Sequence, residues 1–307
     1  MVKALFSERL FKFLRKFVSP FVIIVIGFFI VKLLLSDVSG AKDAFLNIGW
    51  SNLAFAALFY FLCFYMRALT WNFVVDTFGY KLKLRDKLFS WFASEAARYV
   101  PGNVWSFVGK YYLSRKNGIS KLHAVTAISL EVFILLTATF TLSLPALIVN
   151  YQKLSLNYSI LIAIFIIALL LIVFFFFNEQ INKIFKIFGK APKRVFLSKK
   201  FLLAIFFMFF TWFCFGIGTY ILIAPLADGG NMLIIISTCI FAWLVGYLSL
   251  ITPTGLGVRE EAIILLISGY TTHIEAGVVA LTSRLLLISV ESLNLLAWFL
   301  FYKAQKK

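Results

Sequence analysis

Long apolar runs separated by short basic stretches dominate the pattern of this chain. A helix needs roughly 20 apolar residues to cross the hydrocarbon core of a bilayer. Six continuous runs approach or exceed that length: 18–35, 50–76, 122–149, 157–178, 201–225 and 276–302. Two further apolar regions, 86–115 and 232–271, are interrupted by proline and glycine. The pattern therefore predicts an all-α integral membrane protein with about eight hydrophobic segments.

Composition agrees with this pattern and narrows the class. Of the 307 residues, 62% are hydrophobic and only 14% are charged, and the mean hydropathy is +0.95. Soluble domains carry about a quarter charged residues, so a soluble class is excluded. Because no polar stretch is long enough to hold a core of its own, we expect residues 1–307 to form a single transmembrane domain.

The distribution of basic residues predicts the topology. The chain has a formal net charge of +17. Its Lys and Arg residues concentrate in five places: the N-terminal stretch, 77–87, 110–121, 179–200 and the C-terminal tail. The connections near 36–49, 150–156 and 226–231 hold only Lys42 and Lys153. Cytoplasmic loops of membrane proteins carry the excess of Lys and Arg, so we expect the five basic regions and both termini in the cytoplasm. Since the charge follows topology, nucleic-acid binding is not expected.

This topology makes the interrupted regions unusual. Both flanks of 86–115 are then cytoplasmic, and its first arm, about 88–99, is too short to cross. A re-entrant helical hairpin is the simplest solution. Region 232–271 must begin and end outside, as a re-entrant hairpin or as two full crossings. The order helix, helix, broken hairpin, helix occurs in 18–149 and again, with opposite orientation, in 157–302. This order favours an inverted-topology repeat. The alternative is that the two halves are unrelated, because any chain of eight segments can be divided into two sets of four.

The interruptions themselves predict a cavity. The structure-breaking residues are Pro101, Gly102, Pro253, Gly255 and Gly257. A broken helix in lipid exposes backbone polar groups, which is tolerated only inside protein or beside a water-filled cavity. A helix that restarts there presents free N–H groups and the positive end of its dipole. Asn103 is suited to cap such a helix or to donate into the cavity.

Charged residues inside the apolar segments are candidates for the lining of this cavity. An intramembrane charge costs about 2.5–3.5 kcal/mol on insertion scales and is usually functional. The predicted substrate-binding residues are Arg98, Asn103, Lys110, Glu131, Arg259, Glu260, Arg284 and Glu291. Their cations favour an anion such as a phosphate headgroup. Their carboxylates would balance the charge, carry a proton or bind a cationic headgroup.

Four of the charges have simpler interpretations. Arg67 lies near the cytoplasmic end of its segment and could snorkel to headgroups. Glu95 lies three residues before Arg98 and could only neutralise it. Glu131 could be a packing partner for a nearby cation, and Glu261 could be a solvated acid at a helix start.

Motifs for catalysis are missing from the sequence. It has only two histidines, His123 and His273, and its three cysteines are scattered without metal-ligand or disulfide spacing. No phosphate-binding G-x-x-x-x-G-K-[ST] loop occurs. We therefore expect no enzyme activity, no metal and no cofactor.

Two stretches resemble the signatures of the flippase-like membrane family, which includes the transmembrane domain of lysylphosphatidylglycerol synthases. The stretch 97–118 matches the first signature, with Arg98, Pro101, Gly102, Gly109 and Lys110 in place. The stretch 252–269 matches the second, with Pro253, Gly255, Gly257, Arg259 and Glu260 in place. Arg284 stands where the family often has an arginine in its last helix. The resemblance covers essentially the whole chain.

The resemblance implies movement of a lipid between the leaflets of a prokaryotic cytoplasmic membrane. The expected cargo is an anionic or aminoacylated phospholipid or a polyprenyl-linked lipid. Because no synthetase sequence follows residue 307, aminoacyl transfer is not expected. An alternative is an accessory or scaffold protein of a lipid-modification or polysaccharide pathway, with a synthase or glycosyltransferase as partner.

Overall fold

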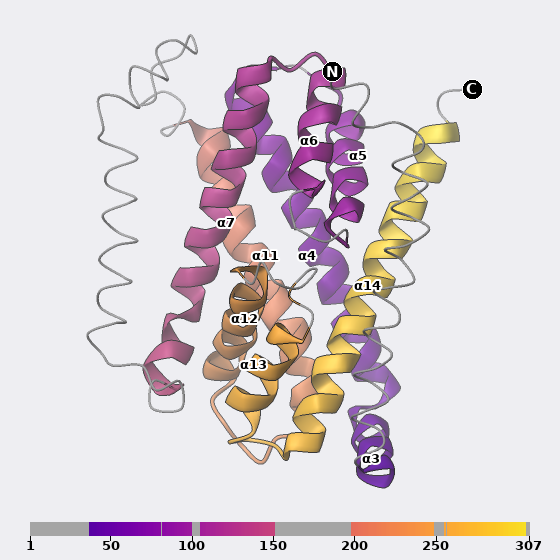
Figure 1. Ribbon diagram of the computed structural model, residues 1–307, viewed down its shortest axis with the longest axis vertical. Helices are drawn as coiled ribbons and strands as arrows, with labels where there is room; N and C mark the ends of the chain where they lie inside the picture. The colour runs from indigo at the N-terminus through magenta and orange to yellow at the C-terminus, as the bar shows by residue number, and fades with distance from the viewer. Residues whose placement is uncertain are drawn as a thin grey trace.

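The computed structural model describes residues 37–80, 82–99, 105–150, 198–248, 255 and 257–304, and every regular element in them is helical (Figure 1). The apolar runs 18–35 and 157–178 lie outside these residues. So do Pro101, Gly102, Asn103 and Pro253. Predictions that concern them therefore remain predictions.

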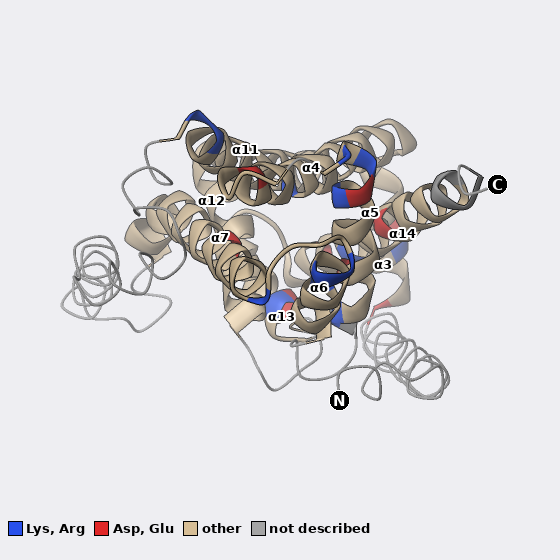
Figure 2. Ribbon diagram, turned by 90° about the horizontal axis from the view of Figure 1, so that it is seen from above, with Lys and Arg blue, Asp and Glu red and all other residues tan. Residues whose placement is uncertain are grey.

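Four long helices form the frame of the part of the chain that the structure describes. They are α4 (Trp50–Thr77), α7 (Lys121–Asn150), α11 (Lys199–Ile223) and α14 (His273–Ala304). Each is long and apolar enough to cross a membrane. Their bounds follow the predicted runs closely, so the prediction of a multi-pass α-helical membrane protein is confirmed. Seen from above, α4 and α11 lie side by side, and the long helices carry few charged residues (Figure 2).

Two pairs of shorter helices fill the space between the long ones. The first pair is α5 (Leu84–Glu95), which continues as the 3-10 turn η1 (Ala96–Tyr99), and α6 (Trp105–Lys116). The second pair is α12 (Met232–Leu248) and α13 (Val258–Ile267). In each pair the two helices pack against each other. The first pair occupies the upper half of the long helices and the second pair the lower half (Figure 1).

Helix length limits what these pairs can do. At 1.5 Å per residue, the 12 residues of α5 rise about 18 Å and the 10 residues of α13 rise about 15 Å. The hydrocarbon core is about 30 Å thick. Neither α5 nor α13 is therefore long enough to cross as a single helix.

One helix was missed by the sequence pattern. We expected only a connection at 36–49, but α3 (Val38–Ile48) forms there. The Asp37 carboxylate caps its start by accepting a hydrogen bond of 2.9 Å from the Gly40 N–H. The helix packs on α14. At 11 residues it is too short to resemble a membrane span, so a search for apolar runs of spanning length does not find it.

Small residues allow the closest helix contacts, as is usual in membranes. Gly218 on α11 leaves room for the ring of Tyr60 on α4, whose hydroxyl bonds to Thr219 at 2.9 Å. Gly255 has a positive φ of 70°, and a Cβ atom there would lie 2.4 Å from the carbonyl oxygen of Gly246. The backbone of α12 at Gly246 and the backbone at Gly255, just before α13, are thus in contact, and neither glycine has room for a side chain.

Candidate functional site

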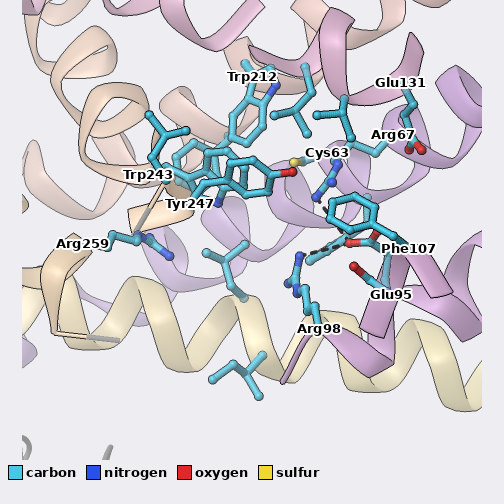
Figure 3. A pocket seen from close by; sticks show the side chains of 18 of the residues that line it. Cys63, Arg67, Glu95, Arg98, Phe107, Glu131, Trp212, Trp243, Tyr247 and Arg259 are labelled. Atoms are coloured by element: carbon cyan, nitrogen blue, oxygen red, sulfur yellow. Dashed lines mark hydrogen bonds and ion pairs between the residues drawn. The ribbon is translucent and has the colours of Figure 1, made fainter. Parts of the chain in front are cut away.

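A cavity of about 310 Å³ lies where the two short helix pairs meet the long helices (Figure 3). Its charged lining residues are Arg67, Glu95, Arg98, Lys110, Glu131, Arg259 and Arg284. Aromatic rings form much of the remaining wall, among them Phe64, Phe107, Trp212, Phe215, Trp243 and Tyr247. The lining therefore combines many charges with a large aromatic surface.

Six of the charges near this cavity form one ion-pair network, which we call the paired cluster: Arg67, Glu95, Arg98, Lys110, Glu131 and Glu291. Glu95 is its centre. The Glu95 carboxylate lies 3.6 Å from Arg67, 3.3 Å from Arg98 and 3.5 Å from Lys110. The cluster contains three cations and three carboxylates, so its formal charge is zero.

The other two carboxylates complete the paired cluster. Glu131 on α7 lies 2.7 Å from the Lys110 ammonium and accepts a 3.0 Å hydrogen bond from the indole N–H of Trp91. Glu291 on α14 forms an ion pair with Arg98. These contacts join η1 and α6 to two of the long helices. A buried charge is tolerated best when it is paired and hydrogen-bonded. Each charge of the paired cluster has an oppositely charged partner, but the buried Nε atom of Arg67 has no hydrogen-bond partner among the described residues.

Local structure positions these groups. Glu95 is the last residue of α5, and the tight turn of η1 brings Arg98 back beside it. Lys110 approaches from α6, which packs against α5 with Gly109 facing Ser94. A Cβ atom at Gly109 would be 3.5 Å from the Cα atom of Ser94, an ordinary contact distance.

Arg259, on the second helix pair, has a different environment. Only 3% of the residue is exposed, and one of its N–H groups donates to the Ser283 hydroxyl at 3.2 Å. Its guanidinium lies 5.3 Å from the centre of the Phe215 ring. Its buried Nε atom has no hydrogen-bond partner, and no carboxylate among the described residues lies within ion-pair distance. Arg259 is thus a buried cation without a counter-charge in this part of the chain.

The neighbours of Arg259 are already engaged with each other. Arg284 on α14 lies 3.2 Å from Glu260. The other oxygen of Glu260 accepts a 2.7 Å hydrogen bond from the Gly257 N–H, which caps the start of α13. Glu261 is exposed, as expected for a solvated acid at a helix start.

The structure brings most of the predicted residues together. Of these, Arg98, Lys110, Glu131, Arg259 and Arg284 line the cavity. Glu291 and Glu260 lie behind the wall and hold two of those cations. Asn103 lies outside the described residues.

Two lining residues were given a lesser role by the sequence interpretation. Arg67 is 7% exposed and faces Glu95 in the cavity, so snorkelling to headgroups is the wrong interpretation. Glu95 contacts three cations rather than Arg98 alone. The sequence signal that could have identified Arg67 and Glu95 as lining residues was their charge within an apolar segment. The aromatic residues Trp212, Trp243 and Tyr247 carried no such signal, because lipid-facing aromatics look the same in sequence.

Comparison with known proteins supplies the family. No match was found among curated proteins. Residues 17–291 match the protein family described as the lysylphosphatidylglycerol synthase TM region. The match spans both short helix pairs and all the residues that line the cavity. The chain therefore belongs to the family of the lysylphosphatidylglycerol synthase TM region.

Proposed function

We propose that this protein is a lipid translocase that moves a lipid with an anionic headgroup between the two membrane leaflets. The observation that carries the proposal is the cation-rich cavity that lies where the two short helix pairs meet the long helices. The headgroup would enter the cavity while the acyl chains stay in the bilayer. Membership of a family of lysylphosphatidylglycerol synthase membrane regions supports a role in lipid handling.

The chemistry of the cavity supports a headgroup as the ligand. Five cations line it, although each cation buried in a membrane protein is costly. Small-molecule sites are usually about 300–1,000 Å³ in volume, so a cavity of about 310 Å³ accommodates a headgroup but not two acyl chains. Arginine also binds phosphate oxygens through several donors at once.

The arrangement of the helix pairs supports alternating access. In this proposal, α5–α6 and α12–α13 are re-entrant hairpins that reach the cavity from opposite sides of the membrane, as in an inverted-topology repeat. Rocking of the two halves would open the cavity first to one leaflet and then to the other. Both termini would be cytoplasmic, in a prokaryotic cytoplasmic membrane. We propose no enzymatic step, so movement would be downhill or ion-coupled.

A proteoliposome assay tests the function. Full-length protein is reconstituted with fluorescent phosphatidylglycerol, and dithionite bleaches the lipid that reaches the outer leaflet. We expect wild-type vesicles to bleach beyond the half reached in protein-free vesicles. The double variant Arg98→Ala, Arg259→Ala should lose this extra bleaching.

The matched control removes two arginines outside the cavity, Arg85→Ala and Arg115→Ala, and should behave like the wild type. Equal bleaching by the wild type and by the cavity double variant would contradict the assigned site. No extra bleaching by the wild type would contradict translocation, and the accessory or scaffold role would then be the better account.

A further inference from the structure

Among the described residues, the lining of the cavity carries an excess of one positive charge. The cations that line it are Arg67, Arg98, Lys110, Arg259 and Arg284. The carboxylates that line it or pair with a lining cation are Glu95, Glu131, Glu260 and Glu291. Five cations thus face four carboxylates. No other acid of the described residues lines the cavity.

The excess charge can be located at one residue. The paired cluster is balanced within itself, and Arg284 is paired with Glu260. Arg259 is the lining cation that remains without a carboxylate among the described residues. The stretches 100–104 and 249–254, which join the helices of each pair, contain no Asp or Glu and so offer Arg259 no carboxylate.

Arg259 is also placed to hold a ligand. Its side chain extends from α13 toward the middle of the cavity (Figure 3). Its buried Nε–H has no acceptor among the described residues. The Ser283 hydroxyl donates to the Ala280 carbonyl at 2.9 Å, so it orients the guanidinium by accepting from it.

Trp212 provides another unsatisfied donor in the same cavity wall. Trp212 lines the cavity, is 1% exposed, and its indole N–H has no hydrogen-bond partner among the described residues. A buried donor left without an acceptor costs about 1–3 kcal/mol. An anion with several acceptor oxygens would satisfy such donors and neutralise Arg259.

We infer that the cavity binds a lipid phosphodiester that carries one negative charge, and that Arg259 is the residue that binds its phosphate. In a medium of low dielectric constant, the occupied site is most stable when its net charge is near zero. A monoanionic headgroup meets this condition. A phosphate monoester or diphosphate leaves excess negative charge, and a lysine-bearing headgroup leaves excess positive charge. The inference rests on the proposed function in taking the cavity as a headgroup site.

Binding is measured separately from transport, by native mass spectrometry of the full-length protein in detergent. The probes are dihexanoyl forms of phosphatidylglycerol, phosphatidylcholine, phosphatidic acid and lysyl-phosphatidylglycerol. We expect phosphatidylglycerol to bind at least about tenfold more tightly than each of the others, the ratio that one charge-assisted contact supplies. Glycerophosphoglycerol, which has the same phosphodiester but no acyl chain, should bind at least about tenfold more weakly. Equal binding of this soluble probe would overturn a lipid as the ligand.

Variants of Arg259 test whether the charge of this residue determines the lipid preference. Arg259→Gln should lower the affinity for phosphatidylglycerol about tenfold and abolish its advantage over phosphatidylcholine. Arg259→Lys, which keeps the charge, should retain most of that advantage. Arg85→Gln, outside the cavity, should bind like the wild type.

The reciprocal change guards against a variant that fails to fold. Glu131→Gln raises the excess to two positive charges, so the preference should shift toward phosphatidic acid, whose monoester carries about −1.5 to −2 charge at neutral pH. Wild-type affinity in Arg259→Gln, or an unchanged preference in Glu131→Gln, would overturn the inference. Selective binding without any translocation would support the inference and overturn the proposed function.

Discussion

The paired cluster and Arg259 lie in one cavity but differ in how their charge is compensated. In the paired cluster, three cations and three carboxylates connect the first helix pair to three of the long helices. Around Arg259, the neighbours are a hydroxyl and an aromatic ring. Paired charges can hold helices together, whereas an unpaired buried cation weakens the empty protein and stabilises only the occupied one. The comparison therefore separates charges that serve the fold from a charge suited to a ligand.

The largest expected effect comes from removing the ammonium that bridges two carboxylates of the paired cluster. Lys110→Met takes a partner from both Glu95 and Glu131. Breaking a buried pair on one side costs about 3–5 kcal/mol. Thermal unfolding in a fixed detergent should show a strongly lowered midpoint.

The control for this change lies on the same helix. Lys116→Met alters an exposed lysine at the end of α6 and should change stability by no more than about 0.5 kcal/mol. Adding Glu131→Gln to Lys110→Met should recover part of the loss. A midpoint for Lys110→Met equal to that of the wild type would show that the paired cluster does not support the fold.

The two helix pairs also differ in how closely their backbones approach. Gly255→Ala places a methyl group 2.4 Å from the Gly246 carbonyl oxygen and keeps a positive φ, so we expect a loss of about 2–4 kcal/mol. Gly109→Ala meets Ser94 at 3.5 Å and should be neutral or slightly stabilising. Unfolding midpoints of the two variants, compared in the same detergent, check this. Similar midpoints would contradict the difference in packing.

The contact between η1 and α14 should contribute less. Glu291→Gln removes the charge that faces Arg98, and hydrogen bonds to charged groups contribute about 1.5–3 kcal/mol. A double-mutant cycle with Arg98→Gln measures the coupling directly, and we expect about 0.5–3 kcal/mol. If the losses of stability in the two single variants add up to the loss in the double variant, Arg98 and Glu291 do not interact.

The smallest expected effect on stability is at Arg259. Arg259→Gln removes a buried cation that has no carboxylate partner in the described residues, so the unliganded protein should keep or raise its unfolding midpoint. Added phosphatidylglycerol should raise the midpoint of the wild type but not of this variant, because a ligand stabilises only a state that binds it. A large loss of stability in the lipid-free variant would mean that Arg259 serves the fold.

Sequence reasoning located most of the cavity because charge in an apolar segment is costly and conspicuous. It identified Arg98, Glu131 and Arg259 from that signal, whereas Lys110 also fitted the basic region 110–121 that was expected in the cytoplasm. It could not assign partners, because Arg98 and Glu291 are 193 residues apart and meet only because α5 packs against α14. For the same reason it underestimated Arg67, whose role depends on facing Glu95 across two helices.

The amino-acid sequence by itself determined that the chain is a helical membrane protein, where its long helices begin and end, and which residues interrupt it. Those properties follow from hydropathy and backbone chemistry, which act over a few consecutive residues. Only the tertiary structure decided which charges neutralise one another and which one remains unpaired. Ion pairing depends on distances of a few ångströms between side chains from different helices. The difference between the paired cluster and Arg259 therefore appears only when the helices are packed together.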